Sequence, residues 1–311
     1  MYVWGMSDRH RDVKPASVVQ LSAAATGATS PGAYTRWRAT TLGRVTEALE
    51  QRRILELVGS VEGKRVLDLG SGDGLLTATL ATRGALAVGV DIDRSMLRAA
   101  VARTDPGQRQ PARFVEGRLE QLPFRDATFD VVVAVTVLCL LSDRAIAVRE
   151  AVRALRPGGR LIIGDLGRWN TWAAQRRIKG WFGSRLWRSA HFSTAADLSR
   201  LVEGAGLTVD AARGSVYYPP IGLLAGALAS LDRWLGPVTT VGAAFIAVAA
   251  TKSPDEVPSQ TGSSRMRSDS RPGADCDPSR HTAERAIDGV LIRGLELSRS
   301  VDRQRWQRSR A

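Results

Sequence analysis

The sequence predicts an α/β protein with an open, doubly wound sheet, and two short stretches carry most of that prediction. The first is the apolar segment 66–69, which runs into the glycine-rich turn 70–74 and then into helically spaced leucines. The second is the apolar segment 86–91, which ends in the carboxylate of Asp91. The stretch between the glycine turn and Asp91 holds one helix and a short return, as a βαβ unit requires.

Further apolar segments continue the alternation of strands and helices along the chain. Strands are expected at 114–117, 129–133, 160–164, in the region 207–218, and at 244–248. Helices are expected at 34–59, at 143–155 before the helix-stopping segment 156–159, from the capping pair Thr194 and Asp197 onward, and at 221–235. This order places the carboxyl ends of several parallel strands, and therefore the predicted ligand site, at one edge of the sheet.

The glycine turn indicates the kind of ligand. Glycines at 70, 72 and 74 leave room for backbone N–H groups to approach a ligand at the start of a helix. A dinucleotide fingerprint would place its third glycine one residue later, and here that position is Leu75. Asp91, at the end of the next strand, is suited to accept both hydroxyls of a ribose. The competing interpretation is a tight turn between strand and helix that binds no ligand.

The order of motifs resembles that of the class I S-adenosylmethionine-dependent methyltransferases. The resemblance rests on Asp68-x-Gly70-x-Gly72-x-Gly74, on "LPF" at 122–124 with "FDVV" at 129–132, and on "LRPGGRLII" at 155–163. It covers about residues 34–252 and is closest to the small-molecule, methyltransferase-11-like members. The resemblance implies a seven-stranded, Rossmann-like sheet with an antiparallel last strand. It also implies an enzyme that uses S-adenosylmethionine as cofactor.

The resemblance also assigns cofactor-binding residues. Asp91 inherits the contact with the ribose, Met96 lies among the apolar residues beside the adenine, and Tyr34 and Trp37 belong to a leader segment that covers the cofactor. The full expected set is Tyr34, Trp37, Asp68, Gly70, Ser71, Gly72, Gly74, Asp91, Ile92, Met96, Leu119, Glu120 and Val135. Many relatives carry Gly-Asp-Ala after the third strand, where this chain has Arg118, so Leu119 or Glu120 is expected to meet the adenine instead.

Length and composition predict one domain of ordinary size with tails, or two small domains, and the resemblance favours a single methyltransferase domain. Residues 1–33 and most of 253–311 are expected to be disordered, with one helix at 282–299 in the basic C-terminal tail, and residues 34–252 form the domain. The two cysteines, Cys139 and Cys276, stand in unlike contexts, which favours neither a disulfide nor a metal site. With no convincing signal peptide, the expected location is the cytoplasm.

Two insertions, 166–193 and 219–240, are expected to form a lid over the ligand-binding edge. The first holds six cations, no acids and four of the eight tryptophans. Three interpretations are open: a packed cap over the substrate, a segment that touches anionic membrane at the inner face, or a nucleic-acid contact, which is the least favoured. The chain as a whole has a net charge of +13.

The predicted activity is methyl transfer to a small or lipophilic acceptor. A general base is needed only for a poorly acidic hydroxyl or an ammonium acceptor. His191, Asp165, Tyr217 and Tyr218 are candidates, and no partner pattern singles one out. The alternative is a non-catalytic S-adenosylmethionine-binding or membrane-associated protein of the same fold. The acceptor atom and the oligomeric state are not specified by the sequence.

Overall fold

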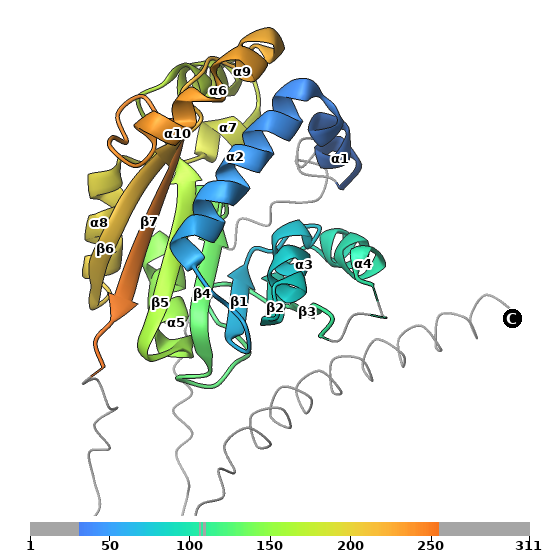
Figure 1. The fold of residues 1–311 in the computed structure, drawn as a ribbon, viewed down its shortest axis with the longest axis vertical. Helices are drawn as coiled ribbons and strands as arrows, with labels where there is room; N and C mark the ends of the chain where they lie inside the picture. The colour runs from blue at the N-terminus through green and yellow to red at the C-terminus, as the bar shows by residue number, and fades with distance from the viewer. Residues whose placement is uncertain (1–30, 106, 108–109, 255–311) are drawn as a thin grey trace, which may run out of the picture.

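The computed structural model describes residues 31–105, 107 and 110–254, and its centre is one seven-stranded sheet (Figure 1). Neighbouring strands are parallel except that β7 runs antiparallel to both of its neighbours, as predicted. In sheet order the strands are β3 (Arg113–Glu116), β2 (Leu86–Asp91), β1 (Arg65–Leu69), β4 (Phe129–Val135), β5 (Leu155–Leu166), β7 (Phe245–Lys252) and β6 (Leu207–Ser215). The predictions for 1–30 and 255–311, including the helix at 282–299, lie outside the described residues.

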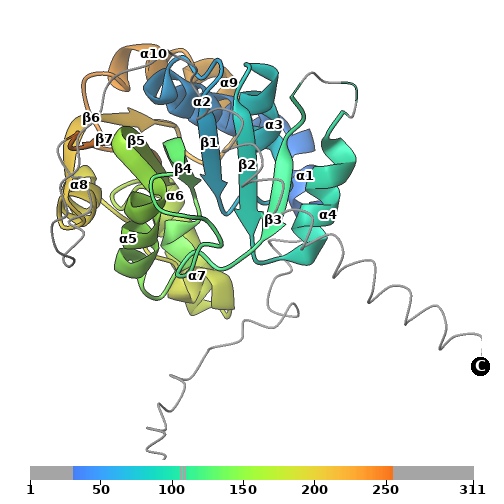
Figure 2. The same cartoon turned by 90° about the horizontal axis from the view of Figure 1, so that it is seen from below.

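Helices cover both faces of the sheet (Figure 2). One face packs against α2 (Thr41–Val58), α3 (Leu75–Thr82) and α9 (Gly222–Leu228), and the other against α5 (Arg144–Ala154) and α8 (Ala195–Glu203). The edge strand β3 is flanked by α4 (Arg94–Arg103). The central strands are buried on both faces, which explains why β4 is apolar at every position after Asp130 rather than alternating.

The remaining helices gather at the end of the sheet toward which the parallel strands point (Figure 1). They are α1 (Pro31–Ala39), the short 3-10 helix η2 (Leu138–Leu140), α6 (Thr171–Trp181), α7 (Arg185–Ser189) and α10 (Leu231–Leu235). Two side-chain hydrogen bonds tie the first predicted insertion to residues that flank the second. The Trp172 indole Nε1 donates to the Tyr218 carbonyl at 2.8 Å, and Asn170 Nδ2 donates to the Ala243 carbonyl at 2.9 Å.

Three predicted elements differ in detail from the structure. The leader helix 34–59 is two helices, because Thr40 adopts an extended conformation and caps α2 by accepting from the Gly43 N–H at 3.0 Å. The predicted helix 221–235 is also two helices, α9 and α10, with a break at 229–230. The segment 156–159 ends α5 as expected, but it belongs to β5, where a shift of register opposite β4 absorbs the extra residues.

Tyr217 and Tyr218 lie beyond β6 rather than inside the sixth strand. β6 ends at Ser215, and Val216 has a φ of 63°, a left-handed conformation that turns the chain away from the sheet. The two tyrosines therefore leave the ladder and pack in different clusters. Tyr217 joins the core on the α5 and α8 face, and Tyr218 joins the core on the α2 face.

Asp232 anchors α10 to the end of β6. Its carboxylate is fully buried and accepts from the Ser215 hydroxyl at 2.8 Å and from the Val216 N–H at 2.6 Å. The same side chain lies 3.4 Å from the Tyr217 N–H. The left-handed turn after β6 is thus held by one carboxylate from the second insertion.

We expect Asp232→Ala to lower the free energy of unfolding by about 2–4 kcal/mol, because buried donors lose their acceptor. Urea denaturation followed by circular dichroism measures the change. Glu203→Ala, an exposed acid at the end of α8, is the control and should change stability by less than about 0.5 kcal/mol. Equal stability of Asp232→Ala and wild type would show that the turn does not depend on this anchor.

Candidate active site

The candidate site begins where the order of the sheet reverses. The chain runs outward from β1 to β3 and then returns to β4 on the other side of β1. Such a switch point leaves a crevice at the carboxyl ends of the two central strands, where open α/β sheets bind ligands. Leu69 at the end of β1 is in register with Ala134 of β4, so the glycine turn 70–74 opens directly into this crevice.

The three glycines of the turn have left-handed backbone conformations but different surroundings. A Cβ on Gly70 would lie 2.3 Å from the Val137 side chain, and one on Gly74 would lie 2.6 Å from Phe114. A Cβ on Gly72, whose φ is 54°, would meet no atom within 4 Å. The outer glycines are therefore required by packing, while the middle one presents bare backbone to open space.

Asp91 joins the end of β2 to the glycine turn. Its carboxylate accepts from the Gly72 N–H at 2.8 Å and from the Asp93 N–H at 2.9 Å. Burial raises the pKa of this carboxyl, while the two backbone donors lower it. These two hydrogen bonds fix the carboxylate at the rim of the crevice, in the place where the resemblance assigns the ribose contact.

Two polar groups lie beneath the turn. Asp68 is buried and accepts from the Thr77 hydroxyl at 2.6 Å, and burial raises its pKa to about 7 despite that hydrogen bond. The Ser71 hydroxyl oxygen is buried and has no hydrogen-bond partner in the described part of the chain. A buried hydroxyl without a partner is costly, so this atom is a site where a polar ligand would be stabilising.

Helix α1 is fastened to the glycine turn by ion pairs that the sequence analysis missed. The Arg38 guanidinium donates to both carboxylate oxygens of Asp73, at 2.8 and 2.7 Å. Arg103 of α4 donates to the same carboxylate at 2.8 Å, and Arg38 also pairs with Glu47 at 2.7 Å. Although burial opposes it, these arginines hold the pKa of Asp73 below its ordinary value.

The ion pair between Arg38 and Asp73 holds the predicted leader residues of α1 beside the glycine turn. The Tyr34 and Trp37 rings are stacked with centroids 5.6 Å apart, and the Arg38 guanidinium lies 4.2 Å from the centre of the Tyr34 ring. Asp73 stands inside the glycine motif, and Arg38 follows Trp37 directly. The only signal in the sequence was Asp73 itself, an acid between two glycines of the motif, which indicated that a cation from another element packs against it.

The other predicted cofactor residues line the same edge. Ile92 follows β2 and is 61% exposed, Met96 is buried in α4, and Val135 ends β4. After β3, Leu119 is buried, whereas Glu120 lies 3.5 Å from the Arg118 guanidinium. The structure thus gathers the predicted residues of β1, β2, β3 and β4 along one edge. The adenine contact of Leu119 or Glu120 remains a prediction.

Two of the four candidate bases form structural contacts. Asp165 is fully buried, accepts from the Leu166 N–H at 2.9 Å, and lies 3.7 Å from the Arg144 guanidinium. Burial raises the pKa of Asp165 to about 6. The Tyr217 hydroxyl donates a short hydrogen bond to the Thr239 carbonyl, and burial raises its pKa to about 12. A tyrosine engaged in this way is poorly placed to remove a proton from a substrate.

The other two candidates differ in exposure. His191 is exposed, and its backbone N–H donates to the Cys139 carbonyl at 2.8 Å. Burial of part of the ring and the nearby Arg144 lower the pKa of His191. Tyr218 is buried and shares a 2.8 Å hydrogen bond with the Thr46 hydroxyl, and burial raises its pKa to about 12. Among the described residues, no histidine, cysteine and carboxylate side chains cluster as a metal site would require.

Comparisons with known proteins agree with this geometry. The sequence profile of the methyltransferase domain matches residues 67–163. A ubiquinone biosynthesis O-methyltransferase from Idiomarina loihiensis is 31% identical over 165 residues, which are 50% of this chain and 67% of the relative. The protein belongs to the class I S-adenosylmethionine-dependent methyltransferases. A demethylmenaquinone methyltransferase from Tropheryma whipplei is 35% identical over 122 residues. That alignment covers 39% of this chain and 50% of the relative.

Solved structures share the fold of the methyltransferase. A methyltransferase from Thermotoga maritima has a TM-score of 0.54 and 20% identity, over 71% of this chain and 95% of that one. The magnesium protoporphyrin IX methyltransferase of Synechocystis, solved with S-adenosylhomocysteine, has a TM-score of 0.52 and 18% identity, over 73% and 97%. S-Adenosylmethionine is the cofactor of the family. The open backbone at Gly72, the fixed Asp91 carboxylate and the orphaned Ser71 hydroxyl fit it.

We expect Asp91→Ala to weaken S-adenosylhomocysteine binding by about 1–3 kcal/mol, because the ribose loses a charged acceptor and the Gly72 N–H loses its partner. This corresponds to roughly 5- to 150-fold in the dissociation constant measured by calorimetry. Gly72→Val should weaken binding further, since it closes the only open position of the turn. Asp105→Ala, an exposed acid beyond α4, is the control. Unchanged affinity in both site variants, or micromolar affinity for NAD, would contradict this site.

Proposed function

We propose that this protein transfers the methyl group of S-adenosylmethionine to a small, lipophilic acceptor that it meets at an anionic membrane surface. The observation that carries the proposal is the aromatic and cationic lid at the carboxyl edge of the sheet. Bound S-adenosylmethionine supplies a methyl group already activated on a sulfonium. The residues of the chain then have to position the acceptor and exclude water, which suits an apolar lid.

Two lines of support favour a lipophilic acceptor. The Trp172 ring packs edge-on against the Tyr218 ring, with centroids 6.5 Å apart, and both rings are buried, so the interior beneath the lid is aromatic. The relatives named above include a ubiquinone biosynthesis enzyme and a demethylmenaquinone enzyme, whose names refer to quinones. An isoprenoid quinol is therefore the acceptor class that we test first.

The outer side of the lid supports contact with a membrane. Seven large apolar side chains of the lid and of the residue that follows it are between 70% and 90% exposed: Trp169, Trp181, Phe182, Leu223, Trp234, Val238 and Val241. They come from α6 and the residues on either side of it, from α9 and α10 and from the loop before β7, which lie at the same end of the molecule (Figure 1). Exposed aromatic groups among arginines and lysines are typical of surfaces that enter the lipid headgroup region. Between residues 31 and 254, no helix is long and apolar enough to cross a bilayer.

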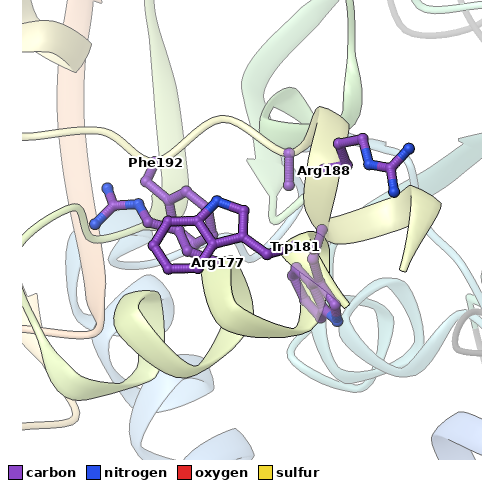
Figure 3. A pocket seen from close by; sticks show the side chains of 7 residues that line it. Arg177, Trp181, Arg188 and Phe192 are labelled. Atoms are coloured by element: carbon purple, nitrogen blue, oxygen red, sulfur yellow. The ribbon is translucent and has the colours of Figure 1, made fainter. Parts of the chain in front are cut away.

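A cavity in the lid suits an anionic headgroup. It lies between α6, α7 and Phe192 and is lined by two cations, Arg177 and Arg188, by Trp181 and Trp187, and by no acid (Figure 3). The Arg177 guanidinium lies 4.9 Å from the centre of the Phe192 ring, which holds it at the cavity wall. A phosphate at either arginine would be paired with a guanidinium group, which binds it in a bidentate manner.

Transfer to a quinol is expected when the protein is incubated with tritiated S-adenosylmethionine and reduced demethylmenaquinone in detergent. Label should enter the organic phase, and water-soluble amines of similar size should receive little, because the aromatic lid favours an apolar acceptor. Asp91→Ala is the negative control, since it lacks the ribose acceptor. Cofactor binding without transfer to any acceptor would favour the non-catalytic alternative. Transfer only to soluble amines would contradict the lipophilic acceptor.

Sedimentation with vesicles should show binding to anionic but not to neutral lipid, and the binding should be lost at high salt. Lys179→Glu with Arg185→Glu, two exposed cations of the lid, should weaken the binding, since each cation contributes about 1 kcal/mol near an anionic surface. The matched control is Arg83→Glu with Arg125→Glu, two exposed cations that precede strands β2 and β4 at the opposite edge. Equal binding by both double variants would attribute the effect to net charge alone and contradict docking through the lid.

A further inference from the structure

Glu50 of α2 is an acid on the buried side of its helix. Residues 46, 49, 50, 53 and 57 share one face at helical spacing, and the other four are buried. Glu50 itself is half-buried, and within the described residues its carboxylate forms no hydrogen bond or ion pair. An acid in such a position costs stability, because neither solvent nor a hydrogen-bonding partner fully stabilises its charge, and groups of this kind are found most often at functional sites.

The surroundings of Glu50 come from both halves of the site. One helical turn earlier on α2, the Thr46 hydroxyl holds the Tyr218 hydroxyl at 2.8 Å. The Tyr218 ring contacts the Trp172 ring of α6, so Tyr218 connects α2 to the lid helix α6. Glu50 also acts electrostatically on Tyr34 of α1, which belongs to the helix clamped to the glycine turn. Glu50 therefore lies between the cofactor side and the lid.

Arg176 of α6 is the opposite charge in this region. Its guanidinium lies between two aromatic rings, 5.2 Å from the centre of Trp172 and 5.0 Å from that of Trp187. It is half-buried, and in residues 31–254 no hydrogen bond or carboxylate pair engages it. Glu50 is nevertheless the charge that acts most strongly on Arg176. The two side chains thus attract each other without forming an ion pair, which leaves their polar atoms available to a third group.

We propose that Glu50 and Arg176 bind the hydroxyl of a weakly acidic oxygen acceptor, a phenol or quinol, with Glu50 as the general base and Arg176 as the group that stabilises the oxygen. The hydroxyl proton passes to the Glu50 carboxylate while the oxygen lone pair forms the new bond to the methyl carbon. The bond between that carbon and sulfur breaks, and its electron pair neutralises the sulfonium. The proton then leaves to solvent. This proposal rests on the methyl-transfer function proposed above and narrows it to oxygen.

The charges around Glu50 suit a base that works near neutral pH. Burial raises the pKa of Glu50 to about 7, Arg176 lowers it, and Glu47 and Asp232 raise it. Tyr34 and Tyr218 also face it, and both are neutral at this pH because burial raises their pKa values. Glu50 is ionised, and therefore able to accept a proton, above about pH 7, so the transfer rate should rise with pH through that value.

Two substitutions test the two roles. Glu50→Gln should lower the single-turnover rate at which the methyl ether of reduced demethylmenaquinone forms by 10²- to 10⁴-fold and remove the rise with pH. Its affinity for S-adenosylhomocysteine should stay within threefold of wild type, which shows that the fold and cofactor site are intact. Glu56→Gln, six residues further along α2 and exposed, is the matched control and should transfer as wild type does.

Arg176→Met should weaken the binding of 4-nitrocatechol, measured by equilibrium dialysis with S-adenosylhomocysteine present, by at least tenfold. Arg176→Lys, which keeps the charge, should recover part of it. Wild-type transfer rates and pH profile in Glu50→Gln, or wild-type probe affinity in Arg176→Met, would overturn the proposal while methyl transfer stands. Probe binding that depends on Arg176, with no transfer by wild type, would instead overturn the methyl-transfer function and the base role together.

Discussion

The switch of strand order between β1 and β4 is the constraint on which the rest of the molecule depends. Parallel strands joined by right-handed crossovers place every carboxyl end on the same edge, and the reversal prevents one loop from covering the next. The topology of the sheet alone therefore brings together the glycine turn, the Asp91 carboxylate and the loop after β4. The sheet itself leaves such a crevice uncovered, and in this chain the crevice is covered by α1 and by the two insertions of the lid.

Different interactions hold the two parts of this cover: ion pairs hold α1, and aromatic packing holds the lid. On the cofactor side, Asp73 binds Arg38 and Arg103, and so couples α1 and α4 to the glycine turn through one buried carboxylate. On the acceptor side, the indole of Trp172 bonds the chain after β6, and Asp232 holds the turn itself. Both sides depend on buried, hydrogen-bonded carboxylates, which are strongly destabilised when one partner is removed.

The cations of the lid divide into two groups with different surroundings. Lys179, Arg185 and Arg188 are exposed, together with the apolar side chains of the outer surface. Arg176 turns inward and lies between two tryptophan rings, where guanidinium groups stack favourably. One segment of the sequence can therefore serve a surface role and an interior role, because a helix presents neighbouring residues to opposite sides.

The sequence by itself determined the sheet, the glycine turn and the carboxylate of Asp91, because these depend on local periodicity and on short motifs that one βαβ unit brings together. Only the tertiary structure decided which acids and cations meet. Arg38 and Asp73 are far apart in the chain and form an ion pair, whereas Glu50 and Arg176, also far apart, come near enough to attract each other. No local pattern links either pair. Tyr217 and Tyr218 likewise looked alike in sequence, and the left-handed turn at Val216 sent them into separate cores. Side-chain pairing across elements follows from how the helices pack, and that packing is not encoded in the spacing of any single segment.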